Sequence, residues 1–216
     1  MSVQICYIIG AGDNYGLDFV PQAGDFVIAA DGGADYLNKQ GMNADLYIGD
    51  FDSVREKPTM GDIITLSQTK DFTDTFEAAK KGIAKGYKHF YIYCGTGGRF
   101  DHTFANIQLL SFLAINNKRG YLMGQDCVTT VISNSNISFD AGCQGYISVF
   151  SYSDTAAGVS IKGLKYELIN HSLTSTLPIG VSNEFTGIES TISVECGNLV
   201  IIFPRGCMNG LRLGPG

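Results

Sequence analysis

The sequence contains no tryptophan, no cluster of lysine and arginine and no cysteine pair at C-x-x-C spacing. The missing basic cluster, in a chain of net charge -6, argues against a broad nucleic-acid-binding surface, and the cysteine spacing argues against a zinc site. No apolar stretch approaches the ~20 residues of a membrane span. The first residues also lack the basic segment of a cleavable signal. We therefore expect a cytoplasmic, reduced protein that binds neither nucleic acid nor membrane.

A P-loop is also absent, because no G-x-x-x-x-G-K-[ST] segment occurs, and this disfavours a P-loop kinase. Apolar residues make up 44% of the chain and charged residues 17%, as in a globular protein with a substantial core. Of the 21 acidic residues 15 are aspartates, and 12 of these precede residue 110. Aspartate favours caps, turns and metal sites, so the acidic chemistry is expected in the first half.

Apolar β-type runs alternate with helical patterns over the first ~120 residues, which indicates βαβ units. The periodic segments Asp74–Lys85 and His102–Asn116 are the clearest predicted helices. The predicted strands are Val3–Ile9, Phe26–Ala30, Leu46–Ile48, Ile63–Leu66, His89–Cys94 and Tyr121–Met123. This pattern predicts an N-terminal three-layer α/β domain, residues 1–125, with a mostly parallel sheet.

Helical periodicity disappears after about Asp126, and short β-rich runs follow between Gly, Ser, Asn and Asp residues. The predicted strands are Cys127–Ile132, Gly145–Phe150, Val159–Ile161 and Glu195–Phe203. We expect a smaller all-β sandwich or barrel domain over residues 126–216, with a frayed tail from Gly206 onward.

Four acidic motifs stand at the ends of predicted strands: Asp31–Asp35 (DGGAD), Gly49–Ser53 (GDFDS), Lys70–Asp74 (KDFTD) and Gly97–His102 (GGRFDH). Ligands of open α/β sheets bind beyond the carboxyl ends of the strands, so these motifs predict a ring of acids around one cleft. Arg99 would complement a polyphosphate there, because a guanidinium binds phosphate oxygens through two donors.

Asp50 and Asp52 lie two residues apart directly after a predicted strand, so their carboxylates are expected on the same side of the chain. Such close like charges repel unless a cation lies between them. Mg²⁺ suits this arrangement, since it usually takes one or two carboxylates together with substrate phosphates.

Structural roles are alternatives for several of these residues. Asp31 could cap a helix, and Asp74 has capping-box spacing to Glu77. Asp101 could cap the helix that follows it or pair with Arg99.

A different enzyme is another alternative. Gly10, Gly12 and Gly16 follow the first predicted strand, and Asp31 comes about 20 residues later, as in a Rossmann-type NAD- or SAM-dependent enzyme. The third glycine, however, is displaced by one position. A non-catalytic nucleotide-binding sensor is a further possibility.

The ordered series DGGAD, GDFDS, KDFTD and GGRFDHTFAN resembles the thiamine pyrophosphokinase (thiamine diphosphokinase) family. Gly163–Tyr166 (GLKY) and Gly180–Phe185 (GVSNEF) resemble segments of that family's β domain. The resemblance spans about residues 28–203. It implies transfer of the diphosphoryl group of ATP to thiamine, giving thiamine diphosphate and AMP, with Mg²⁺. It also implies a homodimer whose active sites lie between the α/β domain of one subunit and the β domain of the other.

The resemblance also implies roles for individual residues. The implied metal ligands are Asp50, Asp52 and Asp74. The implied nucleotide-binding residues are Asp31, Gly32, Gly49, Ser53, Arg99, Asp101 and His102. The implied catalytic residues are Asp71, Asp74, Arg99 and Asp101, and one of the three aspartates would accept the thiamine hydroxyl proton. The implied thiamine contacts are Thr73, Ser182, Asn183 and Phe185.

Overall fold

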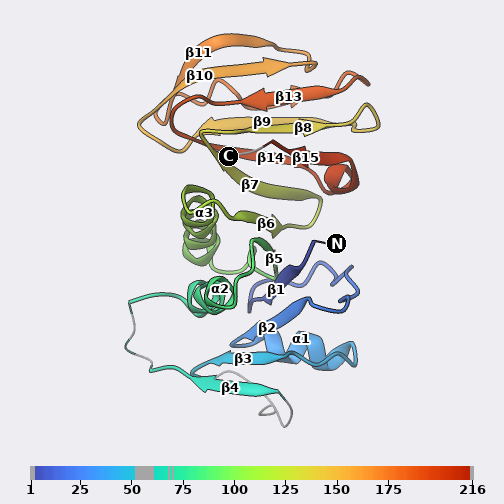
Figure 1. The fold of residues 1–216 in the computed structure, drawn as a ribbon, viewed down its shortest axis with the longest axis vertical. Helices are drawn as coiled ribbons and strands as arrows, with labels where there is room; N and C mark the ends of the chain where they lie inside the picture. Colours follow the sequence, from blue (N-terminus) through green and yellow to red (C-terminus); the bar gives the residue numbers. More distant parts are fainter. Residues whose placement is uncertain (1–2, 52–60, 68, 70, 215–216) are drawn as a thin grey trace. The chain divides into compact units, whose positions relative to one another are not determined.

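The computed structural model describes residues 3–51, 61–67, 69 and 71–214, and the chain divides into two compact units. The first unit comprises Met1–Leu109 and Lys118–Gly124, and the second comprises Leu110–Asn117 and Gln125–Gly216. Figure 1 labels their helices and strands. No helix in the described part of the chain has the length and apolar character that crossing a membrane requires.

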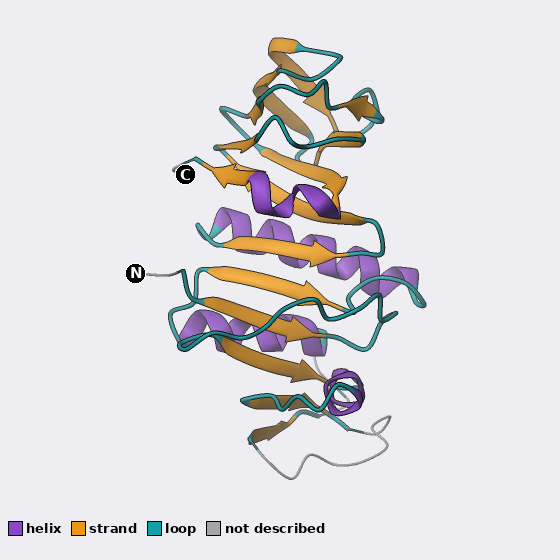
Figure 2. Ribbon diagram, turned by 90° about the vertical axis from the view of Figure 1, so that its right-hand side faces the viewer, coloured by secondary structure: helices purple, strands orange, loops and turns teal. Residues whose placement is uncertain are grey.

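The first unit is built on parallel strands in the order β6-β5-β1-β2-β3-β4. They are β1 (Ile5–Ile9), β2 (Phe26–Ala30), β3 (Leu46–Gly49), β4 (Asp62–Thr65), β5 (His89–Tyr93) and β6 (Arg119–Met123). Most of their residues other than those of β4 are buried, as expected for short apolar runs covered on both faces. The strand arrows of this unit point the same way in Figure 2, so the carboxyl ends share one edge.

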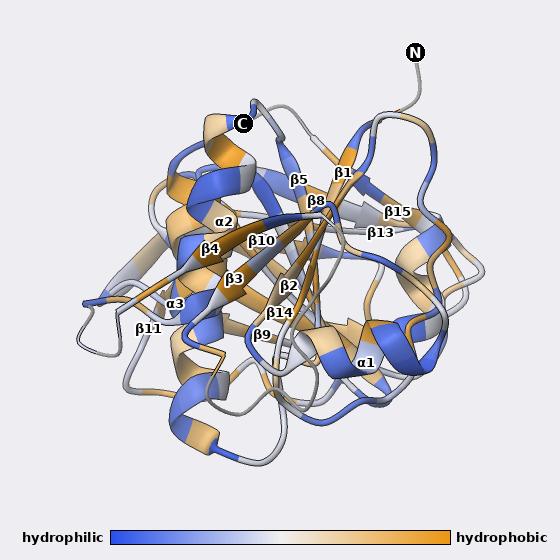
Figure 3. Ribbon diagram, turned by 90° about the horizontal axis from the view of Figure 1, so that it is seen from below, coloured by the Kyte–Doolittle hydropathy of each residue, from blue (hydrophilic) through white to orange (hydrophobic). Residues whose placement is uncertain are grey.

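Helices cover both faces of this sheet. Helix α1 (Gly33–Lys39) and helix α2 (Asp74–Ala84) lie on opposite sides of β2 and β3 (Figure 3). Helix α2 packs very closely, because a Cβ on Gly82 would lie 2.6 Å from Cε1 of Phe90 and 2.8 Å from Sγ of Cys6. Helix α3 (Phe100–Ile115) follows β5. The predicted three-layer α/β arrangement is confirmed.

A row of aromatic side chains crosses β1, β5 and β6. The rings of Tyr7 and Tyr91 lie 5.8 Å apart, those of Tyr91 and Tyr121 lie 5.0 Å apart, and Phe19 stacks on Tyr7 at 4.1 Å. Burial, with smaller contributions from Asp25 and Tyr91, raises the pKa of Tyr7 to about 12. The row therefore carries uncharged phenols at neutral pH.

The second unit contains two antiparallel sheets. The first has the order β12 (Asn183–Glu184), β9 (Tyr146–Ser151), β14 (Asn198–Pro204), β7 (Cys127–Ser133). The second has the order β11 (Leu168–Thr174), β10 (Thr155–Lys162), β13 (Ser190–Ser193), β8 (Asn136–Phe139), β15 (Leu211–Leu213). The ring of Phe139 lies 5.0 Å from that of Phe203 and 5.3 Å from that of Phe185, so side chains of both sheets share one core. The predicted second, all-β part is confirmed.

The tail prediction is wrong. Residues 205–210 form the 3₁₀ helix η1 (Arg205–Gly210), and β15 then pairs with β8 through Leu211 and Phe139. Glycine turn signals suggested fraying, but tertiary pairing orders the segment as far as Gly214, whose N–H donates to Asn136 O at 3.1 Å.

Candidate active site

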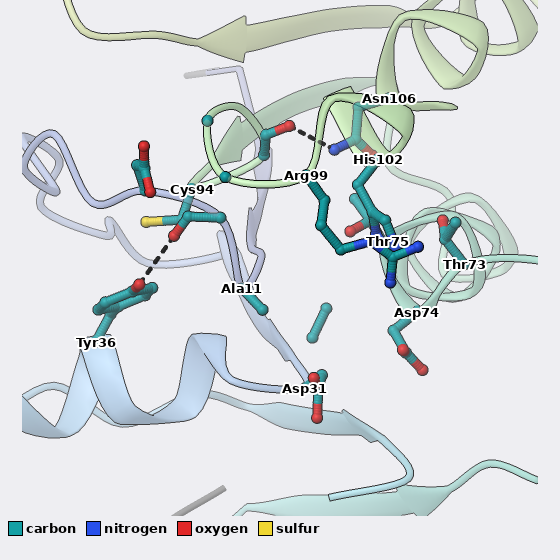
Figure 4. Close-up of a pocket in the computed structure, with 16 residues that line it drawn as sticks. Ala11, Asp31, Tyr36, Thr73, Asp74, Thr75, Cys94, Arg99, His102 and Asn106 are labelled. Carbon is teal, nitrogen blue, oxygen red and sulfur yellow. Dashed lines mark hydrogen bonds between the residues drawn. The ribbon is translucent and has the colours of Figure 1, made fainter. Parts of the chain in front are cut away.

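A cavity of about 360 Å³ lies in the first unit, beyond the carboxyl ends of β1, β2 and β5. Segments 11–13, 30–31, 73–75, 94–95 and 97–99 line it, together with one residue of helix α1 and two of helix α3. Figure 4 shows that its polar side chains come from separate elements. They include Asp31, Tyr36, Asp74, Arg99, His102 and Asn106. Two carboxylates and a guanidinium that share a cavity can bind a metal–phosphate ligand.

Strained backbone marks this edge of the sheet. Asp31, Phe51 and Cys94 follow β2, β3 and β5 with left-handed φ values of 48°, 56° and 52°. Such conformations cost energy in residues other than glycine and gather at functional sites. Gly49 has a packing reason to be glycine, because a Cβ there would lie 3.0 Å from the Cα of Asp31. This close passage fixes Asp31, whose N–H donates to Ile48 O at 2.9 Å.

Helix α2 begins at the cavity. Oγ1 of Thr73 accepts a hydrogen bond from the Phe76 N–H at 3.2 Å, so Thr73 is the N-cap. The alternative in which Asp74 caps this helix through a capping box with Glu77 is therefore wrong. Asp74 is the first helical residue, where the helix dipole favours a carboxylate, and it lines the cavity. Asp31 is not a cap either, since α1 is preceded by Gly32 without a side-chain cap.

Arg99 forms two hydrogen bonds with Asp101, Nη2 to Oδ2 at 2.6 Å and Nε to Oδ1 at 3.2 Å. The alternative in which these two residues pair is confirmed. The pairing raises the pKa of Arg99 and lowers the pKa of Asp101, in both cases mainly through the side-chain hydrogen bond. Arg99 therefore stays charged while it lines the cavity.

The structure brings together five of the predicted site residues, namely Asp31, Thr73, Asp74, Arg99 and His102. Five others of the first unit are described but do not line the cavity, namely Gly32, Gly49, Asp50, Asp71 and Asp101. Asp52 and Ser53 lie outside the described residues. Among the residues that are described, no three His, Cys, Asp or Glu side chains come close enough to form a metal site by themselves.

Sequence reasoning missed two side chains that hold the cavity wall. The Tyr36 hydroxyl donates to Gly12 O at 2.9 Å, and Nδ2 of Asn106 donates to Gly95 O at 2.7 Å. Asn106 belongs to the motif GGRFDHTFAN. Asn106 lies three residues after Thr103 and four after His102, which places the three side chains on one side of the helix. It also lies seven residues, or about two helical turns, after Arg99. That spacing was the available signal.

The Rossmann alternative is wrong. Residues 10–25 are all described and form no helix whose N-terminus could bind a pyrophosphate. Gly10 and Gly12 instead allow close backbone packing, because a Cβ on either would lie 2.7 Å from Cys94 O.

The three residues predicted to contact thiamine from the second domain differ in exposure. Ser182 is exposed, whereas Asn183 is 5% exposed and Phe185 is 8% exposed. Oδ1 of Asn183 accepts from the Tyr166 and Glu184 N–H groups at 3.0 and 2.8 Å, and its Nδ2 donates to Tyr166 O at 2.7 Å. Asn183 therefore ties its segment to the Gly163–Tyr166 segment, and Phe185 packs edge-on against Phe139.

Comparisons with known proteins agree with this arrangement. Residues 20–122 match the family described as "Thiamin pyrophosphokinase, catalytic domain", and residues 132–201 match "Thiamin pyrophosphokinase, vitamin B1 binding domain". A thiamine pyrophosphokinase of Bacillus subtilis (strain 168) is 27% identical over 161 residues, which is 71% of this chain and 75% of the relative.

Solved structures share the whole fold. The thiamin pyrophosphokinase of Geobacillus thermodenitrificans superposes with a TM-score of 0.80 at 26% identity, covering 95% of this chain and 100% of the other. The Bacillus subtilis enzyme gives a TM-score of 0.82 at 24% identity, with 93% and 99% coverage. The yeast enzyme gives 0.72 at 17% identity, with 94% and 87% coverage. With both family matches in the expected order along one chain, this protein belongs to the thiamine pyrophosphokinase family.

Proposed function

We propose that this enzyme transfers the diphosphoryl group of ATP to the hydroxyethyl group of thiamine, giving thiamine diphosphate and AMP. The observation that carries the proposal is the cavity within the catalytic-domain match, where Asp31, Asp74 and Arg99 converge from three separate elements. The vitamin B1 binding match in the second unit supports thiamine as the acceptor.

The reaction requires one bond to form and one to break. The thiamine hydroxyl oxygen attacks the β-phosphorus of ATP, and the bond from that phosphorus to the oxygen of the α-phosphate breaks, so that AMP leaves. Arg99 stabilises the negative charge on the phosphate oxygens, because phosphoryl transfer depends mainly on positioning and electrostatics. Of the three aspartates predicted as proton acceptors, Asp74 lines the cavity. We assign the hydroxyl proton to its carboxylate.

The acidic residues fit a magnesium ion by their chemistry. Mg²⁺ prefers hard oxygen ligands and usually takes one or two carboxylates with phosphate oxygens, so it does not need a complete protein cage. Asp50, Asp52 and Asp74 are the proposed ligands. When bound, the ion neutralises phosphate charge and orients the triphosphate.

The second unit is proposed to bind thiamine. Ser182 is the exposed member of the predicted set and is assigned the direct contact. Asn183 and Phe185 are assigned to shaping the site from beneath, in keeping with their burial. We further propose a homodimer in which the β domain of one subunit completes the α/β site of the other. A cytoplasmic location belongs to the same proposal, since that is where ATP is supplied.

The test is the formation of AMP. Purified protein is incubated with ATP, MgCl₂ and thiamine, and the products are separated by chromatography. Equal amounts of AMP and thiamine diphosphate are expected, with neither formed when thiamine is omitted or a chelator is added. Production of AMP or ADP without thiamine diphosphate would contradict the proposal and favour a hydrolase. Nucleotide binding without release of AMP would contradict it as well and favour a nucleotide-binding sensor.

A further inference from the structure

Two backbone segments form one wall of the cavity, and each accepts a hydrogen bond from a side chain of a neighbouring helix. They are the β1 loop, residues 10–13, and the β5 turn, residues 94–98, and both contribute lining residues. The N–H groups of Gly10, Gly12 and Asp13 donate to the carbonyls of Tyr93, Cys94 and Thr96 at 2.9, 2.7 and 2.9 Å. The two segments therefore continue the pairing of β1 and β5 beyond the sheet. Because Arg99 follows the β5 turn directly, the position of its guanidinium depends on this pairing.

The β5 turn contains one residue with a costly backbone conformation. Cys94 has a left-handed φ of 52°, whereas Gly97 and Gly98 adopt their φ values of 80° and 57° without steric cost, because glycine has no Cβ. Strained backbone of this kind persists only where neighbouring groups hold it in place. Hydrogen bonds from outside the turn are therefore needed to keep one conformation.

Asn106 supplies such a bond from helix α3. Its side chain is 4% exposed, and its Nδ2 donates to Gly95 O at 2.7 Å (Figure 4). A Cβ on Gly95 would lie 3.0 Å from this same Nδ2 and 2.7 Å from Cδ1 of Leu122, so the turn is packed tightly beneath the amide. A buried carbonyl without its donor is costly, and this makes the turn sensitive to Asn106.

Tyr36 supplies the corresponding bond from helix α1, on the other segment. Its hydroxyl donates to Gly12 O at 2.9 Å, and the Gly12 N–H in turn donates to Cys94 O. Burial raises the pKa of Tyr36, and nearby acidic groups add to this, so the phenol remains a donor at neutral pH. Hydrogen bonds thus connect α1 to the β1 loop, the β1 loop to the β5 turn, and the β5 turn to α3.

We propose that the Asn106 amide and the Tyr36 hydroxyl are positioning groups for nucleotide binding. Together they hold the β1 loop and the β5 turn in the arrangement that presents Arg99 to the phosphates of ATP. The proposal rests on the function proposed above and extends it to two lining residues that donate hydrogen bonds to the backbone of the cavity wall.

The test compares matched substitutions. Asn106→Leu and Asn106→Asp remove the donor at nearly constant volume, and Tyr36→Phe removes only a hydroxyl. Asn116→Leu and Tyr87→Phe are the controls, because Asn116 Nδ2 donates to Phe112 O at 2.7 Å and the Tyr87 hydroxyl donates to Gly24 O at 2.9 Å, both outside the cavity lining. Binding of α,β-methylene-ATP with Mg²⁺ and binding of thiamine are measured by calorimetry, beside kcat and both KM values.

The Asn106 variants are expected to bind the magnesium–nucleotide complex about 10- to 100-fold more weakly, as small misplacements do in preorganised sites. Tyr36→Phe should weaken it about three- to tenfold. The thiamine affinity of these variants should stay within about twofold of that of the unsubstituted protein. Both ligand affinities of the two control variants should do the same. A merely structural role would instead lower both ligand affinities together, in proportion to the folded fraction.

Unchanged nucleotide affinity in Tyr36→Phe and in the folded Asn106 variants would overturn the proposal. If the Asn106 variants do not fold, Tyr36→Phe decides. If the unsubstituted protein binds nucleotide but forms no thiamine diphosphate, the proposed function is refuted. The nucleotide affinities of the variants then decide whether Asn106 and Tyr36 position the nucleotide. A parent that binds no nucleotide would refute both.

Discussion

The guanidinium of Arg99 and the carboxylate of Asp101 are joined by two hydrogen bonds across a gap of only one residue in sequence, with Nη2 to Oδ2 at 2.6 Å. Both side chains are largely exposed, at 73% and 63%. Exposed ion pairs contribute little to stability, so the consequence of this pair is geometric. Asp101 holds the guanidinium plane in one orientation at the rim of the cavity.

Replacement of Arg99 by lysine should therefore impair catalysis without affecting folding. Lysine keeps the charge but cannot bind Asp101 and a phosphate through a planar fork. We expect kcat/KM for Mg-ATP to fall about 100-fold, the size of effect seen when one transition-state donor is lost. Steady-state kinetics and thermal denaturation check this, with the exposed Arg212→Lys as control. A decrease of less than threefold would show that the fork is dispensable.

The N-cap of α2 gives a stability prediction. Thr73→Ala removes the acceptor of the Phe76 N–H and should cost about 1 kcal/mol of unfolding free energy. Thr73→Ser keeps the hydroxyl and should cost much less. Denaturant unfolding of the two variants provides the comparison, and equal losses would mean that the methyl group rather than the cap matters.

Asn183 should matter for stability and for thiamine, but not for nucleotide. Asn183→Ala leaves the N–H groups of Tyr166 and Glu184 and the carbonyl of Tyr166 without this partner, and each such group costs about 1–3 kcal/mol when buried. We expect a lower Tm and weaker thiamine binding, with Mg-nucleotide affinity unchanged. Asn209→Ala, at an exposed position of the same unit, is the control. An unchanged Tm would contradict the structural role.

Close packing of α1 can be tested with a single methyl group. A Cβ on Gly33 would overlap with Ile9 O, so Gly33→Ala should displace α1 and destabilise the protein by about 1–3 kcal/mol. Gly206→Ala meets nothing within 4 Å and should be neutral. Thermal denaturation of both proteins is sufficient, and equal Tm values would show that α1 shifts at no cost.

Stability should decline in alkali because of the aromatic row. The folded pKa of Tyr7 is raised to about 12, so its contribution is fully present below the unfolded pKa near 10 and is lost as pH rises toward 12. Tyr7→Phe should move the alkaline unfolding midpoint upward, whereas Tyr146→Phe, at an exposed tyrosine, should not. Circular dichroism across this pH range measures the midpoint, and a downward shift for Tyr7→Phe would refute the burial argument.

Much of the fold was predictable because its strands are short, apolar and buried on both faces. The run Phe26–Ala30 was predicted with its observed bounds. Helix α1 was not predicted, since seven residues opening on Gly33 show too little periodicity, and the helix is fixed by close contact with β1. β15 was missed because its pairing with β8 joins residues about 70 positions apart, which no local pattern reveals.

The site was predictable to the extent that strand ends share an edge. This rule located Asp31, Asp74 and Arg99 at one cavity. It could not locate Tyr36 and Asn106, because their partners are backbone carbonyls whose positions depend on the pairing of segments some 80 residues apart. The rule also could not show that Phe185 is buried, because a phenylalanine beside a turn can be either buried or exposed.

β15 is the outermost strand of the five-stranded sheet, and its pairing with β8 covers that strand's backbone groups. A protein shortened after Gly210 would lack the partner of β8 at this edge, and unpaired strand edges recruit strands from neighbouring molecules. Affinity tags and truncations for recombinant work are therefore better placed at the amino-terminal side, where they leave β15 intact.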